Sequence, residues 1–336
     1  MSRRERTFAA VEHKQPDLTP YTIEFTSTQL EQTCAGYGMD QAELQDYLGN
    51  HCKKVGFNIG GKSEKEGFFT DEYGVVWDRS GSDKDIGVPV TELVSPHDDS
   101  YTYPAPDLEE MVRSVDRALA TRGDAVLFGK IGTTYFERAW SLTGFQNMLM
   151  YLAMEEDFVR ELLDNLLAYN LKIIDAVIDT DIDGFYFGDD YGQQSGLLMS
   201  PPMWRRFFKD GLAAMFARVK SRGKIVALHS CGNITDLLPD LIDIGLDIYQ
   251  TVQPEIYDLS ALKSEFGDRL SFWGGISTQR DLPFDTPDVL RRKIVDTKAV
   301  LGASGGYIAG PTHRLPSDVP FENIRTLVEA LRIEEG

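Results

Sequence analysis

Several features are missing or scarce in this chain of 336 residues, and each absence excludes a class of protein. No apolar run approaches the roughly 20 residues that a membrane-spanning helix needs, so a transmembrane protein is excluded. The N-terminal stretch lacks the apolar segment of a signal peptide, and we therefore expect a cytoplasmic protein. Three cysteines do not make a disulfide framework, which agrees with a reducing compartment.

Positive charge is also in deficit. The chain has 34 Lys and Arg against 53 Asp and Glu, which gives a net charge of −19 at pH 7. Nucleic acids and anionic membrane surfaces both attract basic faces, so neither is expected as a partner. The charge favours solubility and the attraction of a basic partner.

What the chain does contain is an alternation of strand-like and helix-like segments from about residue 124 onward. Such alternation predicts a parallel sheet covered by helices. At this length we expect one (β/α)₈ TIM barrel over residues 1–336, with an N-terminal extension. Seven of its strands can be assigned by their apolar runs, at 21–25, 125–131, 184–187, 225–228, 247–252, 270–274 and 306–309. The clearest helices are expected at 107–122, 155–179, 201–222, 259–266, 286–301 and 322–331.

Residues 57–106 interrupt this alternation with glycines and short strand-like pieces. We expect a β-rich insertion near the barrel mouth, in the form of a hairpin flap. A mobile lid and a structural cover are equally compatible with the sequence. In barrels of this class, functional side chains lie where the strands end and the βα loops begin.

His229 and Cys231 follow one of these expected strands, in the stretch Lys224-Ile-Val-Ala-Leu-His-Ser-Cys-Gly232. Residues two apart on a strand point the same way, so one metal ion could take both side chains. Imidazole and thiolate together are zinc-type ligands. His313 follows the last strand in the same manner, and the three residues form a set with one open position, as catalytic zinc sites have. The alternative for His313 is a hydrogen-bonded loop histidine.

Two adjacent carboxylates, Asp189 and Asp190, follow the strand at 184–187. Neighbouring strand residues face opposite ways, so one of them is expected to act in the site as a general acid or base, and the other to cap the next helix or bind a backbone amide. Gln253 could complete or orient the metal site, and it is also expected to contact the substrate. A pocket for an aromatic substrate is expected from three large side chains, Tyr186, Tyr191 and Trp273, although aromatic residues in a barrel are more often core.

Six stretches of this sequence together resemble the uroporphyrinogen decarboxylase superfamily, and within it the branch of corrinoid-dependent methyltransferases. They are Phe136-Glu-Arg-Ala-Trp140, Gly188-Asp-Asp-Tyr-Gly192, His229-Ser-Cys-Gly232, Gly245-Leu-Asp-Ile-Tyr249, Phe272-Trp-Gly-Gly-Ile-Ser277 and Asp318-Val-Pro-Phe-Glu-Asn-Ile324. The resemblance implies the barrel fold and a zinc ion bound by a His-x-Cys pair and a later cysteine. The later cysteine falls at His313, and an acidic ligand of some relatives falls near Gln253, so the ligand set departs from the pattern.

The resemblance also separates the activities of the superfamily. The decarboxylases hold tetrapyrrole carboxylates with arginines of a Met-Arg-Gln-Ala-Gly-Arg motif, which the matching stretch Pro20–Phe25 lacks. A zinc site with two histidines and one thiolate carries one negative charge less than a site with one histidine and two thiolates, which favours the polarisation of an ether oxygen over the activation of a thiolate.

We therefore expect a zinc-dependent O-demethylase-type methyltransferase, whose methyl donor is an aromatic O-methyl compound. No Asp-x-His-x-x-Gly corrinoid-binding motif occurs in the chain, so cobalamin would come from a partner corrinoid protein. A thiol (coenzyme M-type) methyltransferase and a decarboxylase-like lyase are the alternatives within the superfamily, and a non-catalytic small-molecule-binding barrel is the alternative outside it. A homodimer is compatible with the sequence.

Overall fold

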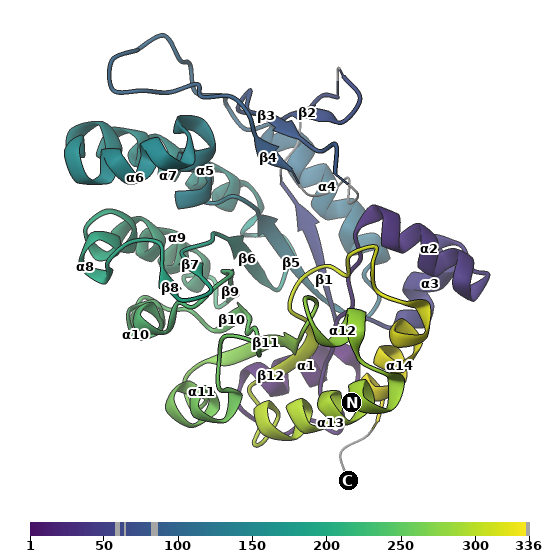
Figure 1. Cartoon of the computed structure of the whole chain (residues 1–336). Helices are drawn as coiled ribbons and strands as arrows, with labels where there is room; N and C mark the ends of the chain where they lie inside the picture. The colour runs from purple at the N-terminus through teal and green to yellow at the C-terminus, as the bar shows by residue number, and fades with distance from the viewer. Residues whose placement is uncertain (58–60, 64, 82–86, 334–336) are drawn as a thin grey trace.

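The computed structural model describes residues 1–57, 61–63, 65–81 and 87–333 of the chain. Seven strands of these residues form one parallel sheet in the order β1-β5-β6-β9-β10-β11-β12. Their bounds are β1 Cys52–Gly56, β5 Val126–Ile131, β6 Gly184–Gly188, β9 Ile225–His229, β10 Ile248–Thr251, β11 Ser271–Ile276 and β12 Tyr307–Pro311. The sheet curls, and Figure 1 shows helices arranged around the strands.

The helices mostly follow the strands as crossover connections, as a parallel sheet requires. Their bounds are α1 Arg3–Val11, α2 Ser27–Tyr37, α3 Gln41–Leu48, α4 Leu108–Thr121, α5 Phe136–Thr143, α6 Phe145–Met154, α7 Glu156–Val177, α8 Pro201–Trp204, α9 Asp210–Lys220, α10 Leu238–Asp243, α11 Leu259–Phe266, α12 Asp281–Phe284, α13 Pro287–Leu301 and α14 Phe321–Leu331. A π-helical turn at Arg205–Lys209 joins α8 to α9, and a 3₁₀ turn at Thr235–Leu237 precedes α10. None of the helices in the described ranges is both long and apolar enough to cross a membrane.

The expected N-terminal strand is not a regular strand. The segment 20–25 makes only isolated bridges to the end of the chain, at Tyr21 with Ala309 and at Phe25 with Leu315. On its other side, the His51 N–H donates to the Tyr21 carbonyl over 2.9 Å. The segment therefore lies between β12 and the residue that precedes β1. The strand that the sequence analysis missed is β1 itself.

Alternation along each strand divides the side chains between two cores. On β5, Val126 and Phe128 face the inner core, while Leu127 faces the outer core between strands and helices. The inner core consists of Cys52, Val126, Phe128, Tyr186, Ile225, Ala227, Ile248, Trp273 and Ile308. Because side chains on a strand repeat with a period of two, the next inward position of each strand toward its carboxyl end lies above this core.

The expected β-rich insertion contains a small antiparallel sheet, with the order β2-β3-β4. Its strands are β2 Phe68–Thr70, β3 Val76–Asp78 and β4 Val88–Pro89, and they are drawn at the top of Figure 1. Residues 58–60, 64 and 82–86 of the insertion lie outside the described part. A third, two-stranded sheet pairs β7 Gly192–Gln193 with β8 Gly196–Leu197 after β6.

Candidate functional site

A cavity of about 720 Å³ opens at the carboxyl ends of the large sheet. Its floor lies above the inner core, because residues of several strands continue that inward face. His229 is the inward position after Ile225 and Ala227 on β9, and Gln250 follows Ile248 on β10 in the same way. Both side chains line the cavity. The two residues are also register partners, so their side chains are neighbours on one face.

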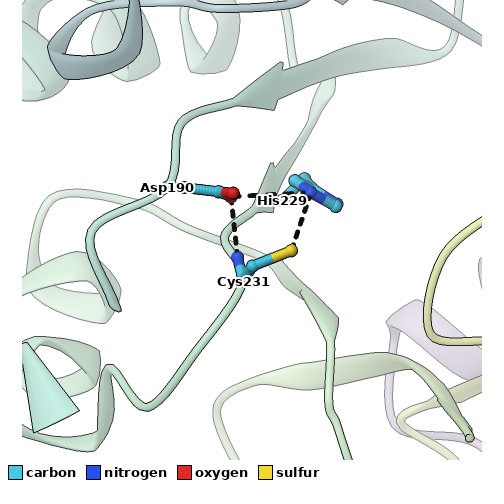
Figure 2. A group of neighbouring side chains, drawn as sticks. All are labelled: Asp190, His229 and Cys231. Atoms are coloured by element: carbon cyan, nitrogen blue, oxygen red, sulfur yellow. Dashed lines mark hydrogen bonds and ion pairs between the residues drawn. The ribbon is translucent and has the colours of Figure 1, made fainter. Parts of the chain in front are cut away.

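Asp190, His229 and Cys231 converge at this floor. Figure 2 shows the three side chains facing one another, Asp190 from the loop after β6, His229 from the end of β9 and Cys231 from the loop that follows it. The Cys231 sulfur lies 3.5 Å from His229 Nε2, and Asp190 Oδ1 lies 3.6 Å from the same nitrogen. One ligand atom from each residue falls within 4.8 Å of the others, which makes the three a candidate metal-binding group. The Cys231 backbone N–H also donates to Asp190 Oδ1 over 2.7 Å and fixes the carboxylate.

These separations fit a zinc ion. Tetrahedral zinc with nitrogen, oxygen and sulfur ligands at about 2.0–2.3 Å separates its ligand atoms by about 3.3–3.7 Å. The two distances at His229 Nε2 lie at or close to that range. Imidazole, thiolate and carboxylate are also the donor types that zinc takes in proteins. The residues present therefore fit a zinc ion with an open coordination position.

Gln250 fixes the orientation of His229. The Gln250 side chain donates from Nε2 to the Thr312 carbonyl over 2.9 Å, so its Oε1 must face the histidine. His229 Nδ1 contacts that oxygen, and since an amide oxygen only accepts, Nδ1 carries the proton. The lone pair is then left on Nε2, which faces Cys231 and Asp190. Tyr186 donates its hydroxyl to the same Gln250 oxygen over 2.8 Å. This arrangement orients a ligand before a metal arrives.

Burial sets the protonation states of the ligands. It lowers the pKa of His229, with the Asp190 charge acting in the opposite direction, so the imidazole is neutral near pH 7. Burial, followed by the charges of Asp190 and Glu137, raises the pKa of Cys231 far above that of an ordinary thiol. Without a metal, Cys231 is therefore a thiol, and a metal ion must displace its proton.

His313, expected as the third ligand, lies beside this group rather than in it. Its ring centroid is 5.7 Å from that of His229, in an edge-to-face arrangement. The ring lines the cavity and is accessible from it. Among the described residues, the three whose ligand atoms lie close together are Asp190, His229 and Cys231. Asp190 therefore takes the place in the ligand set that was expected for His313.

The two adjacent aspartates take opposite directions. Asp190 lines the cavity, whereas Asp189 is fully buried behind it. Asp189 accepts hydrogen bonds from the backbone N–H groups of Phe136 and Glu137, at 3.0 and 2.7 Å, and from the Tyr191 hydroxyl. It thus holds the first turn of α5. Burial raises the pKa of Asp189 to about 6, although these hydrogen bonds act against the shift.

Three of the four expected substrate contacts line the cavity, and one does not. Tyr186, Trp273 and Gln253 are on its wall. Gln253 accepts from the Gly232 N–H over 2.8 Å and so supports the loop that carries Cys231. Tyr191 is buried outside the cavity, stacked on Phe136 and edge-on to Trp204. The expectation for Tyr191 is corrected, because its hydroxyl donates to Asp189 and its ring packs in the outer core, away from the cavity.

The small sheet of the insertion supplies another wall. Phe69, Asp71 and Trp77 line the cavity, and Asp71 is tied to the buried Arg138 of α5 by an ion pair. The Trp77 indole N–H donates to the same carboxylate over 2.9 Å. A second carboxylate, Glu72, lies 3.4 Å from Arg138. The insertion is therefore attached to the cavity by a buried charge cluster.

Two short patterns of other enzyme classes occur in the chain without their structural context. Residues 56–63 match the Gly-x-x-x-x-Gly-Lys-Ser phosphate-loop pattern, but Lys62 pairs with Thr70 in an antiparallel bridge and begins no helix. A phosphate loop requires a helix N-terminus at that place. Residues 302–306 match Gly-x-Ser-x-Gly, but they connect a helix to a strand, which is the reverse of a nucleophile elbow.

Comparison with known proteins agrees with the fold. The family model for uroporphyrinogen decarboxylase (URO-D) matches residues 89–333, which is most of the chain. The chain belongs to the URO-D family. The methylcobamide:CoM methyltransferase MtaA of Methanosarcina barkeri is 26% identical over 196 residues, covering 57% of this chain and 54% of that protein. The uroporphyrinogen decarboxylase of Coxiella burnetii is 23% identical over 201 residues, covering 59% and 54%.

Matches to these two curated relatives span about half of their length. A solved structure of a methyltransferase from Methanosarcina mazei superposes with a TM-score of 0.74 over 98% of both chains, at 17% identity. That likeness shows the fold, and the URO-D family and this neighbour together make the fold TIM-like.

Proposed function

We propose that this URO-D family chain is a zinc-dependent methyltransferase that moves a methyl group between a small molecule and a corrinoid cofactor. The observation that carries the proposal is the group of Asp190, His229 and Cys231 at the floor of a cavity large enough for a small substrate. The similarity to MtaA of Methanosarcina barkeri supports the corrinoid as the second reactant.

Each residue of the group has a distinct task in this proposal. Cys231 and Asp190 supply negative charge to a metal ion, and His229 supplies a neutral nitrogen that Gln250 holds in position. A zinc ion bound there would supply Lewis-acid chemistry to an oxygen or sulfur atom of the substrate. Tyr186 and Trp273 offer flat apolar walls beside that position. The insertion supplies a further wall of the cavity, with Phe69 and Trp77 among its lining residues.

An O-methyl compound is the first candidate for the methyl donor, and with such a donor the chain would be the methyltransferase component of an O-demethylase. The walls formed by Tyr186 and Trp273 support an aromatic ether. The preference for an ether over a thiol, however, was based on the charge of a zinc site with two histidines and one thiolate. With Asp190 in place of His313, the ligand set carries two negative charges, so the ligand charge no longer favours an ether over a thiol.

A thiol acceptor is the second candidate, and the same observation favours it. A site with two anionic ligands and one imidazole has the formal charge that was expected of a thiol-activating site. In this version methylcobamide is the donor and a small thiol is the acceptor. The name of the M. barkeri relative, a methylcobamide:CoM methyltransferase, supports this direction of transfer.

We also propose that residues 1–336 form one domain, a (β/α)₈ barrel. In this barrel the segment 20–25 occupies the position of the eighth strand, and residues 57–106 form a flap over the mouth. A separate corrinoid protein would bring the cobalamin to that mouth.

One spectroscopic assay tests the function and its direction. Cob(I)alamin is incubated with the zinc-loaded protein and a panel of O-, S- and N-methyl compounds, and methylcobalamin with a panel of thiols. We expect conversion with an aromatic methyl ether or with a thiol, and loss of it in Cys231→Ser. Cys34→Ser is the matched control, because Cys34 lies on α2, away from the cavity. No turnover in either direction would leave a non-catalytic binding protein as the better explanation.

A further inference from the structure

One lysine of the large sheet faces the cavity from the interior of an apolar strand. Lys130 on β5 is the inward position that follows Val126 and Phe128, and its side chain lines the cavity. Its register partner on β6 is Tyr186, so the two side chains are neighbours on one face of the sheet. Lys130 therefore lies beside an aromatic wall, near the carboxyl end of its strand, where barrels of this class carry their functional side chains.

The Lys130 nitrogen is not engaged by other side chains. No hydrogen bond and no ion pair joins it to another residue within the described ranges. A partly buried lysine normally finds a partner, as Lys54 on the neighbouring strand does by donating to Glu24 over 2.7 Å. The Lys130 amine is therefore available to a molecule that occupies the cavity.

Charges of both signs act on Lys130 from the surrounding elements. Burial, followed by the positive charges of Lys54 on β1 and Arg314 after β12, lowers the pKa of Lys130 to about 8. The negative charges of Glu24 and Glu137 act in the opposite direction, and Glu137 lines the same cavity. These carboxylates reduce the shift but do not cancel it. Because the pKa of an ordinary lysine is about 10.4, a much larger share of Lys130 is the uncharged amine near neutral pH.

We propose that Lys130 is a nucleophilic amine that condenses with an aromatic aldehyde in the cavity and holds it as an imine. The electron pair of Nζ attacks the carbonyl carbon and forms the C–N bond. The carbonyl oxygen takes up the two protons of the amine and leaves as water, so the step needs no oxidant and no reductant. Glu137 offers a carboxyl group in the same cavity that can carry those protons. Desolvation and a neighbouring cation are the two features that activate lysine for this chemistry.

The neighbours of the amine favour an aromatic carbonyl compound. Phe128, one inward position below Lys130, packs against Trp273 with ring centroids 5.8 Å apart. Trp273 in turn meets Tyr186 edge-on at 5.6 Å, and both of these side chains line the cavity. A ring attached to Lys130 can pack against them, which an aliphatic aldehyde would do less well. The inference goes beyond the proposed function, because an imine can form whether or not the metal-binding group holds zinc.

The test uses benzaldehyde as the probe and cyanoborohydride, which reduces an imine to a stable benzylamine. The full chain is treated near pH 8 and digested, and the benzylated lysines are located by mass spectrometry. At that pH about half of Lys130 is free amine, against less than about 1% of an ordinary lysine. We expect Lys130 to be labelled at least about tenfold faster than the other lysines, since its lower basicity offsets part of this gain.

A pH profile separates an activated lysine from one that is merely accessible. Labelling of Lys130 should level off above about pH 8, whereas labelling of ordinary lysines should rise further toward about pH 10. His229 and His313 add no charge in this range, because burial lowers the pKa of both imidazoles. Lys54→Met removes a positive charge that acts on the amine, and it should slow the labelling of Lys130 near pH 7 several-fold.

Lys53→Met is the matched control, because Lys53 lies next to Lys54 on β1 but donates to the Thr121 carbonyl outside the cavity. It should leave the labelling of Lys130 unchanged, and thermal unfolding shows whether each variant is folded. Equal labelling of Lys130 and Lys53 in the wild type, or the same pH profile for both, would overturn the proposal. A reactive Lys130 without methyl transfer would refute only the proposed function. Methyl transfer by a protein whose Lys130 is unreactive would refute only this inference.

Discussion

Replacement of Gln250 by leucine should weaken zinc binding although Gln250 cannot itself contact a zinc ion held by His229 Nε2. The side chain is buried, accepts from His229 Nδ1 and the Tyr186 hydroxyl, and donates to the Thr312 carbonyl. Leucine has a similar size but can make none of these hydrogen bonds. Removal of the Gln250 amide leaves these three groups without this hydrogen-bond partner. Each buried polar group that loses its partner costs about 1–3 kcal/mol in the free energy of unfolding. The imidazole also loses the contact that fixes its tautomer and its direction.

Loss of such an outer contact lowers metal affinity by about 10- to 100-fold, or roughly 1.4–2.8 kcal/mol. We expect this loss for Gln250→Leu, measured by competition with a chromophoric zinc chelator. Gln250→Glu keeps an acceptor facing His229 and should retain affinity within about tenfold.

Gln29→Leu is the matched control for this variant. Gln29 is equally buried, its Nε2 donates to the Val319 carbonyl, and neither Gln29 nor Val319 lines the cavity. It should lower the free energy of unfolding without changing zinc affinity. A folded Gln250→Leu that binds zinc as tightly as the wild type would refute the orienting role of this residue.

Three further predictions follow from the buried charges. Zinc binding near pH 7 should release about one proton, because the pKa of Cys231 is raised in the metal-free protein; calorimetry in buffers of different ionisation enthalpy should detect it, and Cys231→Ser should abolish it. The pKa of Asp189 is raised to about 6, so its protonated form stabilises the fold below about pH 4 and this contribution is lost as the pH rises through 6. Urea titrations should therefore show the wild type losing up to about 3 kcal/mol relative to Asp189→Asn between pH 4 and 7, and parallel pH profiles would contradict this. Arg138→Met should cost about 3–5 kcal/mol in the free energy of unfolding, because it leaves Asp71 buried and unpaired, whereas the exposed Arg117→Met should cost less than about 1 kcal/mol.

Much of the fold follows from the sequence because apolar runs and helix boundaries are local signals. The expected helix at 107–122 is α4, whose Asp107 caps the Glu110 N–H, and the expected helix at 286–301 is α13 with Pro287 in its first turn. β1 could not be predicted from an apolar run, because two of its five residues are the lysines Lys53 and Lys54. The segment 21–25 has an apolar pattern, but the structure gives it only isolated bridges.

The part of the candidate site that depends on one strand end could be predicted from residue spacing. His229 and Cys231 lie together because they are two apart after β9. The choice between Asp190 and His313 depends on how neighbouring strand ends approach, which the sequence alone does not fix. Gln250 could have been found from its inward position on β10, by the period-two rule that also places Ile248 in the inner core.

Lys130 carried an overlooked signal of the same kind. A lysine inside the apolar run Ala125–Ile131 is unusual, since lysine is almost never buried unless it is paired. Strand alternation places it on the same face as Val126 and Phe128, and therefore in the cavity. Its lowered pKa and its position among other cations required the neighbouring strands.

X-ray absorption at the zinc edge of the zinc-loaded protein tests directly whether Asp190, His229 and Cys231 hold the metal. We expect one sulfur ligand at about 2.3 Å and one imidazole, with oxygen completing the set. The sulfur contribution should disappear in Cys231→Ser. A spectrum of the wild type without sulfur, or with two imidazoles in place of one, would refute this ligand set.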